Sequence, residues 1–207
     1  GCCRELSPNV CPLEYSAYGS GDSRTTPLKV RFHDGASVCG LRFSSAEFIE
    51  NKPALKGLPA LHDDKRKSQS VEICLKDKIY DLRVYLLYTV FEEYDIISRS
   101  VRVENHTGED IMLESVLSTC IDNYEDEFDF VTFDGKPIYE RSFNRTQLGE
   151  LKLTCESRRG SSSHQNNPFV IFCSKNCDEK IGECYGSAFV YSGNFTASME
   201  KTQIGTT

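Results

Sequence analysis

The stretch SVEICLKDKIYDLRVYLLYTVF, residues 70–91, decides the fold class of this chain of 207 residues. On both sides of a polar break its apolar residues occupy every second position, at Val71, Ile73, Leu75, Leu82, Val84 and Leu86. This period of two is typical of a half-buried strand, because successive side chains of a strand point to opposite faces. The break Lys76-Asp77-Lys78 predicts a turn, and the second strand continues to Phe91. The stretch therefore predicts a β-hairpin.

The same alternation recurs along the rest of the chain. Residues 28–32 alternate in this way, and Asp34-Gly35 predicts a hairpin turn into a strand over residues 38–43. Further strand-like runs cover residues 96–104, 111–119, 151–155, 169–173 and 185–200. We find no segment with an apolar stripe at the helical period of about 3.6 residues. The chain is therefore predicted to be an all-β, antiparallel β-sandwich, with residues 1–207 as a single domain.

Composition limits the classes of protein to which the chain can belong. It has 24 Lys and Arg against 31 Asp and Glu, which gives a formal net charge of -7. Binding to a phosphate backbone needs clustered cations, so no nucleic acid partner is expected. The apolar runs fall short of the roughly 20 residues of a membrane span, so no membrane partner is expected either. The chain begins at Gly1 rather than Met and stops abruptly at Thr207, so we expect a fragment.

The chain contains ten cysteines, at positions 2, 3, 11, 39, 74, 120, 155, 173, 177 and 184. A chain of this length can build a core without disulfides, and a free Cys in an apolar β-like run packs as a small hydrophobic residue. This pattern favours reduced thiols and a cytoplasmic protein. A secreted, disulfide-bonded protein stays open as an alternative, because there are three N-x-S/T sequons, at Asn105, Asn144 and Asn194. The last three cysteines lack the two short-spaced pairs of a structural zinc site.

Two polar segments are candidates for chemistry. The first is acidic and contains Asp122, Glu125, Asp126, Glu127 and Asp129. It lacks the residue order of an EF-hand loop, so we expect a solvated acidic surface. The second, SRRGSSSHQNNPF at residues 157–169, has many donors and acceptors, which must pair with each other, with water or with another surface. Either a plain surface loop or a docking surface for a second domain explains this segment.

Several segments carry distinctive patterns in one order along the chain. They are residues 18–24, YGSGDSR; 52–60, KPALKGLPA; 88–95, YTVFEEYD; 99–101, RSV; 157–169, quoted above; 182–186, GECYG; and 190–195, VYSGNF. Together they resemble the N-terminal β-supersandwich domain of glycoside hydrolase family 36 α-galactosidases, the enzymes that cleave melibiose and raffinose. The resemblance extends from Tyr15 to the C-terminus.

This resemblance implies a galactose-mutarotase-like supersandwich that is incomplete at both ends. In the family a (β/α)8 barrel follows the sandwich and supplies both catalytic aspartates for the retaining hydrolysis of terminal α-linked galactose, so no catalytic residue is expected in this chain. The implied function is a non-catalytic domain that supports the barrel, shapes the pocket rim and contributes to a homo-oligomer, and that is inactive on its own. No cofactor or metal is implied, because two carboxylates and water suffice for this reaction.

The resemblance also marks candidate site residues. In many members a G-x-W-x-R-E-R segment brings a Trp to the sugar. The matching stretch here is GKPIYER, residues 135–141, which has Pro137 in the Trp position, and the chain has no Trp. Pro137 and Tyr139 are therefore the substrate-adjacent candidates, with a structural role as the alternative for Tyr139. A structural or barrel-facing role is expected for Glu140, Arg141, Arg159, His164, Gln165 and Asn167.

Two other functions stay open at this point. One is a stand-alone β-sandwich that binds sugar or protein without catalysis. The other is a decayed gene product without a function, which the missing Trp and the abrupt ends of the chain would fit.

Overall fold

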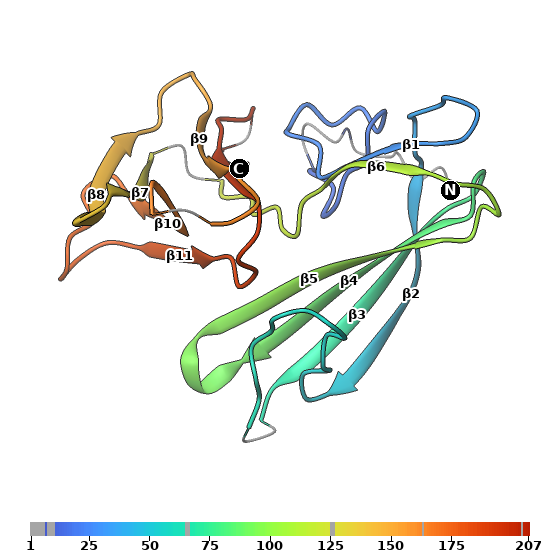
Figure 1. Ribbon diagram of the computed structural model, residues 1–207, viewed down its shortest axis with the longest axis horizontal. Helices are drawn as coiled ribbons and strands as arrows, with labels where there is room; N and C mark the ends of the chain where they lie inside the picture. Colours follow the sequence, from blue (N-terminus) through green and yellow to red (C-terminus); the bar gives the residue numbers. More distant parts are fainter. Residues whose placement is uncertain (1–6, 8–10, 65–66, 125–126, 163, 204) are drawn as a thin grey trace. The chain divides into compact units, whose positions relative to one another are not determined.

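The computed structural model describes residues 7, 11–64, 67–124, 127–162, 164–203 and 205–207. Within them the regular structure is almost all β, and neighbouring strands are antiparallel (Figure 1). The strands are β1 (Leu28–Arg31), β2 (Leu41–Glu50), β3 (Gln69–Asp77), β4 (Leu82–Phe91), β5 (Ile96–Asn105), β6 (Met112–Val116), β7 (Phe128–Lys136), β8 (Tyr139–Gln147), β9 (Leu153–Ser157), β10 (Asn166–Ser174), β11 (Cys184–Ala188) and β12 (Phe195–Met199). A short 3-10 helix covers Glu92–Tyr94. The predicted all-β, antiparallel fold is confirmed.

The chain divides into two compact units. Unit 1 consists of residues 1–56 and 61–121, and unit 2 consists of residues 57–60 and 122–207. Each unit combines a four-stranded sheet with a two-stranded sheet and has its own cluster of buried apolar side chains. The single domain expected over residues 1–207 stays a prediction, because compactness alone does not decide whether the units fold together.

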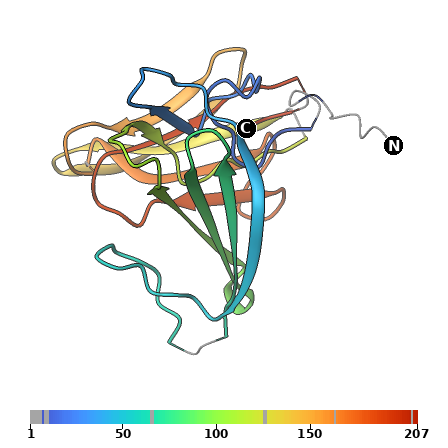
Figure 2. The same cartoon turned by 90° about the vertical axis from the view of Figure 1, so that its right-hand side faces the viewer.

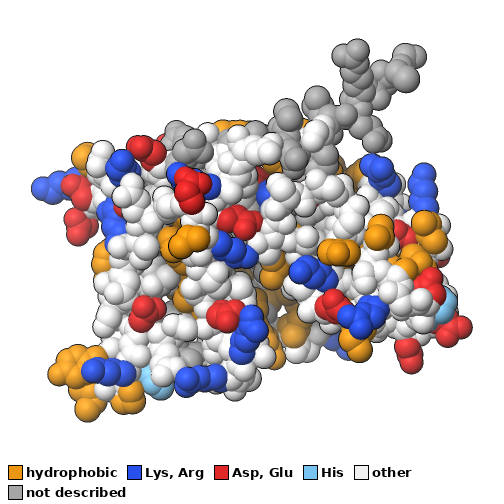
Figure 3. Space-filling model, turned by 90° about the horizontal axis from the view of Figure 1, so that it is seen from above, with side chains coloured by type: hydrophobic (Ala, Val, Ile, Leu, Met, Phe, Trp, Pro, Cys, Tyr) orange, Lys and Arg blue, Asp and Glu red, His pale blue; other side chains and the backbone are white. Residues whose placement is uncertain are grey.

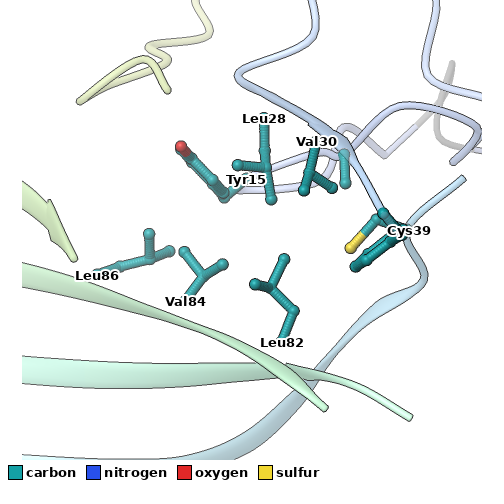
Figure 4. Packing of buried hydrophobic residues seen from close by; sticks show 9 residues of the cluster. Tyr15, Leu28, Val30, Cys39, Leu82, Val84 and Leu86 are labelled. Carbon is teal, nitrogen blue, oxygen red and sulfur yellow. The ribbon is translucent and has the colours of Figure 1, made fainter. Parts of the chain in front are cut away.

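The four-stranded sheet of unit 1 has the order β2-β3-β4-β5, and its strands lie side by side in both views (Figure 1 and Figure 2). The second sheet of this unit pairs β1 with β6. Alternate side chains of β4 point toward β1. The core between the sheets contains Leu82, Val84 and Leu86 together with Leu28 and Val30 (Figure 4). These five side chains are almost fully buried, so unit 1 is a two-layered sandwich.

The hairpin predicted over residues 70–91 is present as β3 and β4. Its turn comes later than predicted, because β3 continues through Asp77. The buried Asp77 carboxylate accepts the N–H groups of Ile79 and Tyr80 at 2.9 and 2.8 Å through Oδ1, and that of Gly40 at 2.6 Å through Oδ2. A side-chain carboxylate that bonds the backbone two and three residues onward fixes a turn, so Asp77 ends the strand.

The hairpin predicted around Asp34-Gly35 is wrong, although the turn itself is present. Gly35 has a φ of 86°, and Asp34 Oδ1 accepts the N–H of Ala36 at 2.9 Å. The next strand, β2, pairs with β3, whereas β1 pairs with β6 from a distant part of the sequence. Turn chemistry sets only the local chain direction, and the packing of apolar faces selects the partner of each strand.

The four-stranded sheet of unit 2 has the order β11-β10-β7-β8, and β9 pairs with β12 in the second sheet. Its core contains Phe128, Phe130, Leu148, Cys155, Val170, Phe195 and Met199. The alternation rule does not predict β7 or β8, because β7 begins with four consecutive buried residues and every residue of β8 is exposed. The single strand predicted over residues 185–200 is two strands, β11 and β12, which belong to different sheets.

Charged side chains of both signs lie on the surface (Figure 3). On the face shown in Figure 3, acidic and basic side chains are interspersed, and neither sign forms a broad continuous area. In the described part of the chain, no helix has the length and apolar composition needed to cross a membrane.

Candidate functional site

The β7–β8 hairpin carries the two substrate-adjacent candidates at its tip. Lys136 pairs with Tyr139 across the strands, so Pro137 and Ile138 form the turn. Proline fixes φ near about −65°, which suits the first turn position. Ile138 has a φ of 78°, in the left-handed region that β-branched residues rarely adopt. Glu140 Oε1 accepts the N–H of Ile138 at 3.1 Å, so this side chain holds a strained turn.

Both candidates at the tip are open to solvent. Pro137 is exposed, and Tyr139 is 66 % exposed and lies outside the apolar core of unit 2. Lys136 Nζ lies 5.5 Å from the centroid of the Tyr139 ring, within the range of a cation–π interaction. An exposed ring beside an exposed pyrrolidine offers an apolar surface on which a ligand can pack. A contact of either residue with a sugar stays a prediction.

The second candidate segment, the polar loop over residues 157–169, runs from the end of β9 (Ser157) through the connection to β10, and its last four residues are the start of β10. It satisfies part of its own polarity, because Ser157 Oγ donates to the carbonyl of Ser161 at 2.7 Å. It is also tied to the segment before β12, since Asn194 Oδ1 accepts the N–H of Gly160 at 2.6 Å. Pairing within the loop and with the segment before β12 therefore explains part of its polar composition, and a docking role stays a prediction.

Gly135 brings the β7–β8 hairpin against the polar loop. Its N–H donates to the carbonyl of Gln165 at 3.2 Å. A Cβ atom at Gly135 would lie 2.8 Å from Glu140 Cα, 2.8 Å from the Tyr139 carbonyl oxygen and 2.9 Å from the His164 carbonyl oxygen. Only glycine tolerates so close an approach of backbone on both sides. The structure thus brings four of the candidate residues together through backbone packing.

The other candidates differ in exposure. Arg141, Arg159 and His164 are exposed, and Arg141 has a left-handed φ of 61°. Asn167 is half-buried, and its carbonyl accepts a hydrogen bond from Cys155 Sγ at 3.9 Å. Asn167 therefore contacts the core of unit 2 through its backbone. For the three exposed side chains a barrel-facing role stays a prediction.

An aromatic cluster supports the end of the polar loop. The Phe133 ring stacks on Phe169 with centroids 5.5 Å apart and an interplanar angle of 28°. It also meets Phe143 edge-on, at 6.0 Å and 75°. A Cβ atom at Gly186 would lie 3.2 Å from the Phe169 ring, so β11 passes close beside it. Aromatic pairs contribute about 0.5–1.5 kcal/mol beyond their buried area, so Phe169 anchors the loop to the sheet.

Arg145 is a structural residue that sequence reasoning misses. Its Nε donates to Asp129 Oδ2 at 2.6 Å, and its Nη1 donates to the Cys177 carbonyl at 2.7 Å. Its Nη2 donates to the carbonyls of Ser174 and Lys175 at 3.0 and 2.8 Å. The hydrogen bond to the carboxylate raises the pKa of Arg145. No local signal reveals this role, because the partners lie 16 to 32 residues away in sequence.

The acidic segment is only partly the solvated surface that we expected. Asp122 and Glu127 are exposed, and Glu125 and Asp126 lie outside the described residues. For Asp129 the expectation is wrong, because this residue is only 7 % exposed and forms the ion pair with an arginine of β8. Its position at the buried start of β7 turns its side chain away from solvent.

The segment YGSGDSR, residues 18–24, contains a buried ion pair. Arg24 Nε donates to Asp22 Oδ1 at 3.0 Å, and Arg24 Nη2 donates to Asp22 Oδ2 and to the Leu13 carbonyl, both at 2.6 Å. The two side chains are only 3 % and 2 % exposed. Burial alone would raise the pKa of Asp22, but the hydrogen bonds from Arg24 outweigh it and hold this pKa below its usual value. The pair fixes the chain before β1.

Two of the hollows on the described surface are small. One, of about 130 Å³, is lined by Glu127, Phe128, Asp129, Gln147, Leu148, Lys175 and Lys201. The other, of about 140 Å³, is lined by residues 62–64, 67, 68 and 91–94. Ligand pockets usually enclose about 300–1,000 Å³, and neither hollow includes Pro137 or Tyr139. Among the described residues no cluster of His, Cys, Asp and Glu side chains suits a metal ion.

Comparison with known proteins shows where this arrangement belongs. The family model described as the glycosyl hydrolase family 36 N-terminal domain matches residues 3–207. The chain belongs to this family. This family 36 domain is 42% identical over 204 residues to the bifunctional alpha-galactosidase/sucrose kinase AgaSK of Mediterraneibacter gnavus, covering 99% of the chain and 22% of that relative. It is 41% identical over 204 residues to alpha-galactosidase AgaA of Geobacillus stearothermophilus, covering 98% of the chain and 28% of that relative.

Solved structures agree with the sequence comparison. The domain is similar to the crystal structure of the family 36 alpha-galactosidase AgaB from Geobacillus stearothermophilus, with a TM-score of 0.91, 40% identity and coverage of 94% of this chain and 27% of that one. For AgaA from the same organism the TM-score is 0.89 at 41% identity, with coverage of 93% and 27%. The predicted resemblance is confirmed, and the chain spans between 22% and 28% of the length of these relatives.

Proposed function

We propose that this family 36 domain is the non-catalytic N-terminal part of an α-galactosidase that removes terminal α-linked galactose from oligosaccharides such as melibiose and raffinose. The observation that carries this proposal is the identity of 42% and 41% with two named alpha-galactosidases over nearly the whole chain. Crystal structures of AgaA variants in complex with stachyose and with raffinose support the choice of substrate class. No cofactor is required, since paired carboxylates and water perform this chemistry.

The domain supports the catalytic barrel and contributes to the pocket rim through the tip of the β7–β8 hairpin. Three features favour this tip. Its apolar candidates, Pro137 and Tyr139, are exposed, its turn is held by Glu140, and Gly135 packs it against the polar loop. A rigid tip with exposed rings loses little entropy when a sugar packs on it. We further propose that the whole enzyme is cytoplasmic, as the burial of most cysteines among the described residues favours, and that it is a homo-oligomer.

The first test measures hydrolysis of p-nitrophenyl α-galactoside by the 207-residue chain and by the whole protein encoded by its gene. We expect release of nitrophenol by the whole protein and none above a blank by the chain alone. Hydrolysis by the purified chain would overturn the non-catalytic assignment. An inactive whole protein would overturn the α-galactosidase assignment, and galactose binding by the isolated chain would then favour a stand-alone sugar-binding module.

The second test addresses the hairpin tip in the whole enzyme. Tyr139→Ala removes the exposed ring, and we expect a higher KM for raffinose with little change in kcat, because the ring binds the ground state and the transition state alike. Tyr124→Ala is the matched control, since Tyr124 belongs to the same unit and is 73 % exposed. Equal kinetic constants for the two variants and the parent enzyme would remove Tyr139 from the pocket rim.

A further inference from the structure

Three cysteines gather around the turn between β10 and β11. Cys173 lies near the end of β10, Cys177 lies in the turn, and Cys184 begins β11. Cys177 Sγ and Cys184 Sγ are 3.5 Å apart. A disulfide needs these two atoms about 2 Å apart, so the two sulfur atoms would have to approach each other by about 1.5 Å.

The backbone of the turn keeps this pair together. The N–H of Ser174 donates to the Glu183 carbonyl at 2.9 Å, and the N–H of Asp178 donates to the Ile181 carbonyl at 3.0 Å. Gly182 has a φ of 97°, and a Cβ atom at this position would lie 2.7 Å from Cys177 Cα. Glycine is therefore required where the chain folds back over Cys177. The backbone of this turn therefore holds Cys177 beside the start of β11.

Arg145 of β8 clamps the same turn from the sheet side. Its Nη1 donates to the Cys177 carbonyl at 2.7 Å, and its Nη2 reaches the Lys175 carbonyl at 2.8 Å. The guanidinium is itself fixed by the buried Asp129 at 2.6 Å. The turn that carries Cys177 is thus tied to two strands of the sheet by charge-assisted hydrogen bonds.

The two thiols differ in access to solvent. Cys184 is exposed, whereas Cys177 is only 8 % exposed. The hydrogen bond with Cys184 and burial raise the pKa of the Cys177 thiol, which lowers its thiolate fraction. Cys173 is 3 % exposed, and burial raises the pKa of its thiol as well. An oxidant from solution therefore meets Cys184 first.

We propose that Cys177 and Cys184 form a dithiol oxidation site that closes to a disulfide by exchange with a low-molecular-weight disulfide such as oxidised glutathione. The Cys184 thiolate attacks one sulfur of oxidised glutathione, which forms a mixed disulfide and releases one glutathione thiol. Cys177 then loses its proton to solvent and attacks Cys184 Sγ, which releases the second glutathione thiol. Two protein thiols are oxidised and one glutathione disulfide is reduced to two thiols, so atoms and electrons balance.

Trypsin distinguishes this pair from every other, because it cuts after Lys175, Lys180 and Lys201. The reduced whole protein is incubated with oxidised glutathione, alkylated and digested without reductant. We expect residues 176–180 linked to residues 181–201 as the dominant cross-linked species, and its loss after reduction. A dominant link from residues 160–175, which carry Cys173, would overturn the assignment. Glutathionylated or alkylated Cys177 and Cys184 peptides without a cross-link would overturn it too.

Two cysteine variants show which thiol closes the disulfide. Cys173→Ser removes the neighbouring thiol, and we expect the same cross-link as in the parent protein. Cys177→Ser removes the resolving thiol, and we expect the cross-link to be replaced by a stable glutathionyl group on Cys184. Repeating the reaction in denaturing urea should scatter the links among many cysteines. An unchanged link between the same two peptides in urea would refute the role of the folded turn.

Discussion

Replacing Gly135 with alanine tests the close approach that joins the β7–β8 hairpin to the polar loop. Three backbone atoms lie 2.8 to 2.9 Å from the position of the new Cβ atom, and none of them can rotate away. Overpacking of this kind costs about 1–3 kcal/mol. Separation of the two segments would also lose the hydrogen bond to Gln165, which contributes about 1 kcal/mol. The loss of unfolded-chain entropy returns about 0.4–1 kcal/mol, so we expect a net destabilisation of about 1–3.5 kcal/mol.

Gly149→Ala is the control for this prediction. Gly149 belongs to the same unit, has no positive φ, and has nothing within 4 Å of its Cβ position. At Gly149 alanine only lowers the conformational entropy of the unfolded chain, so we expect a stabilisation of up to about 1 kcal/mol. Urea unfolding of both variants measures the free energies. Hydrogen exchange of peptides over residues 134–141 and 160–168 should show faster exchange in Gly135→Ala alone. Equal unfolding free energies for the two variants would refute the packing argument.

Two further changes probe strain and charge. Ile138→Asn replaces a β-branched residue at a φ of 78° with one that tolerates this conformation. Since Ile138 is 89 % exposed, we expect the free energy of unfolding to rise by about 1 kcal/mol, measured by thermal unfolding. A lower free energy of unfolding would show that the turn is unstrained. Asp22→Asn removes the carboxylate charge that faces the buried guanidinium of Arg24, so we expect a loss of about 3–5 kcal/mol at pH 7 by urea unfolding. The folded pKa of Asp22 is lowered, so the greater unfolding free energy of the parent protein over the variant is fully present above about pH 4. It disappears as pH falls through the lowered folded pKa. A free-energy difference that does not change with pH would contradict this account.

The sequence predicts those parts of the fold in which burial alternates along a strand. The hairpin of β3 and β4 follows from its alternating residues, although the buried carboxylate of Asp77 moves its turn. The strand β8 escapes prediction because all its residues are exposed, so its side chains carry no pattern. The partner of β1 escapes too, because strand pairing over a long sequence separation leaves no trace in the turn at Gly35.

The candidate site likewise combines residues that the sequence marks with contacts that only the structure shows. Its residues are marked in sequence by their resemblance to family motifs, whereas only the strand pairing in the structure shows that Pro137 and Ile138 form the turn. The contact of this turn with the polar loop is invisible in sequence, because it depends on backbone atoms of His164 and Gln165 rather than on side-chain chemistry. The role of Arg145 is invisible for a related reason, since most of its partners are carbonyl groups, which every residue has.

The sequence by itself determines that the chain is all-β and which family it belongs to, because alternation and motif order are local and linear properties. Only the tertiary structure decides which strands pair, that Asp129 is buried, and that Cys177 lies 3.5 Å from Cys184. These features depend on how the chain folds back on itself. Apolar packing between the sheets selects the strand partners, Asp129 is buried against Arg145, and Gly182 and Arg145 hold the turn that carries Cys177.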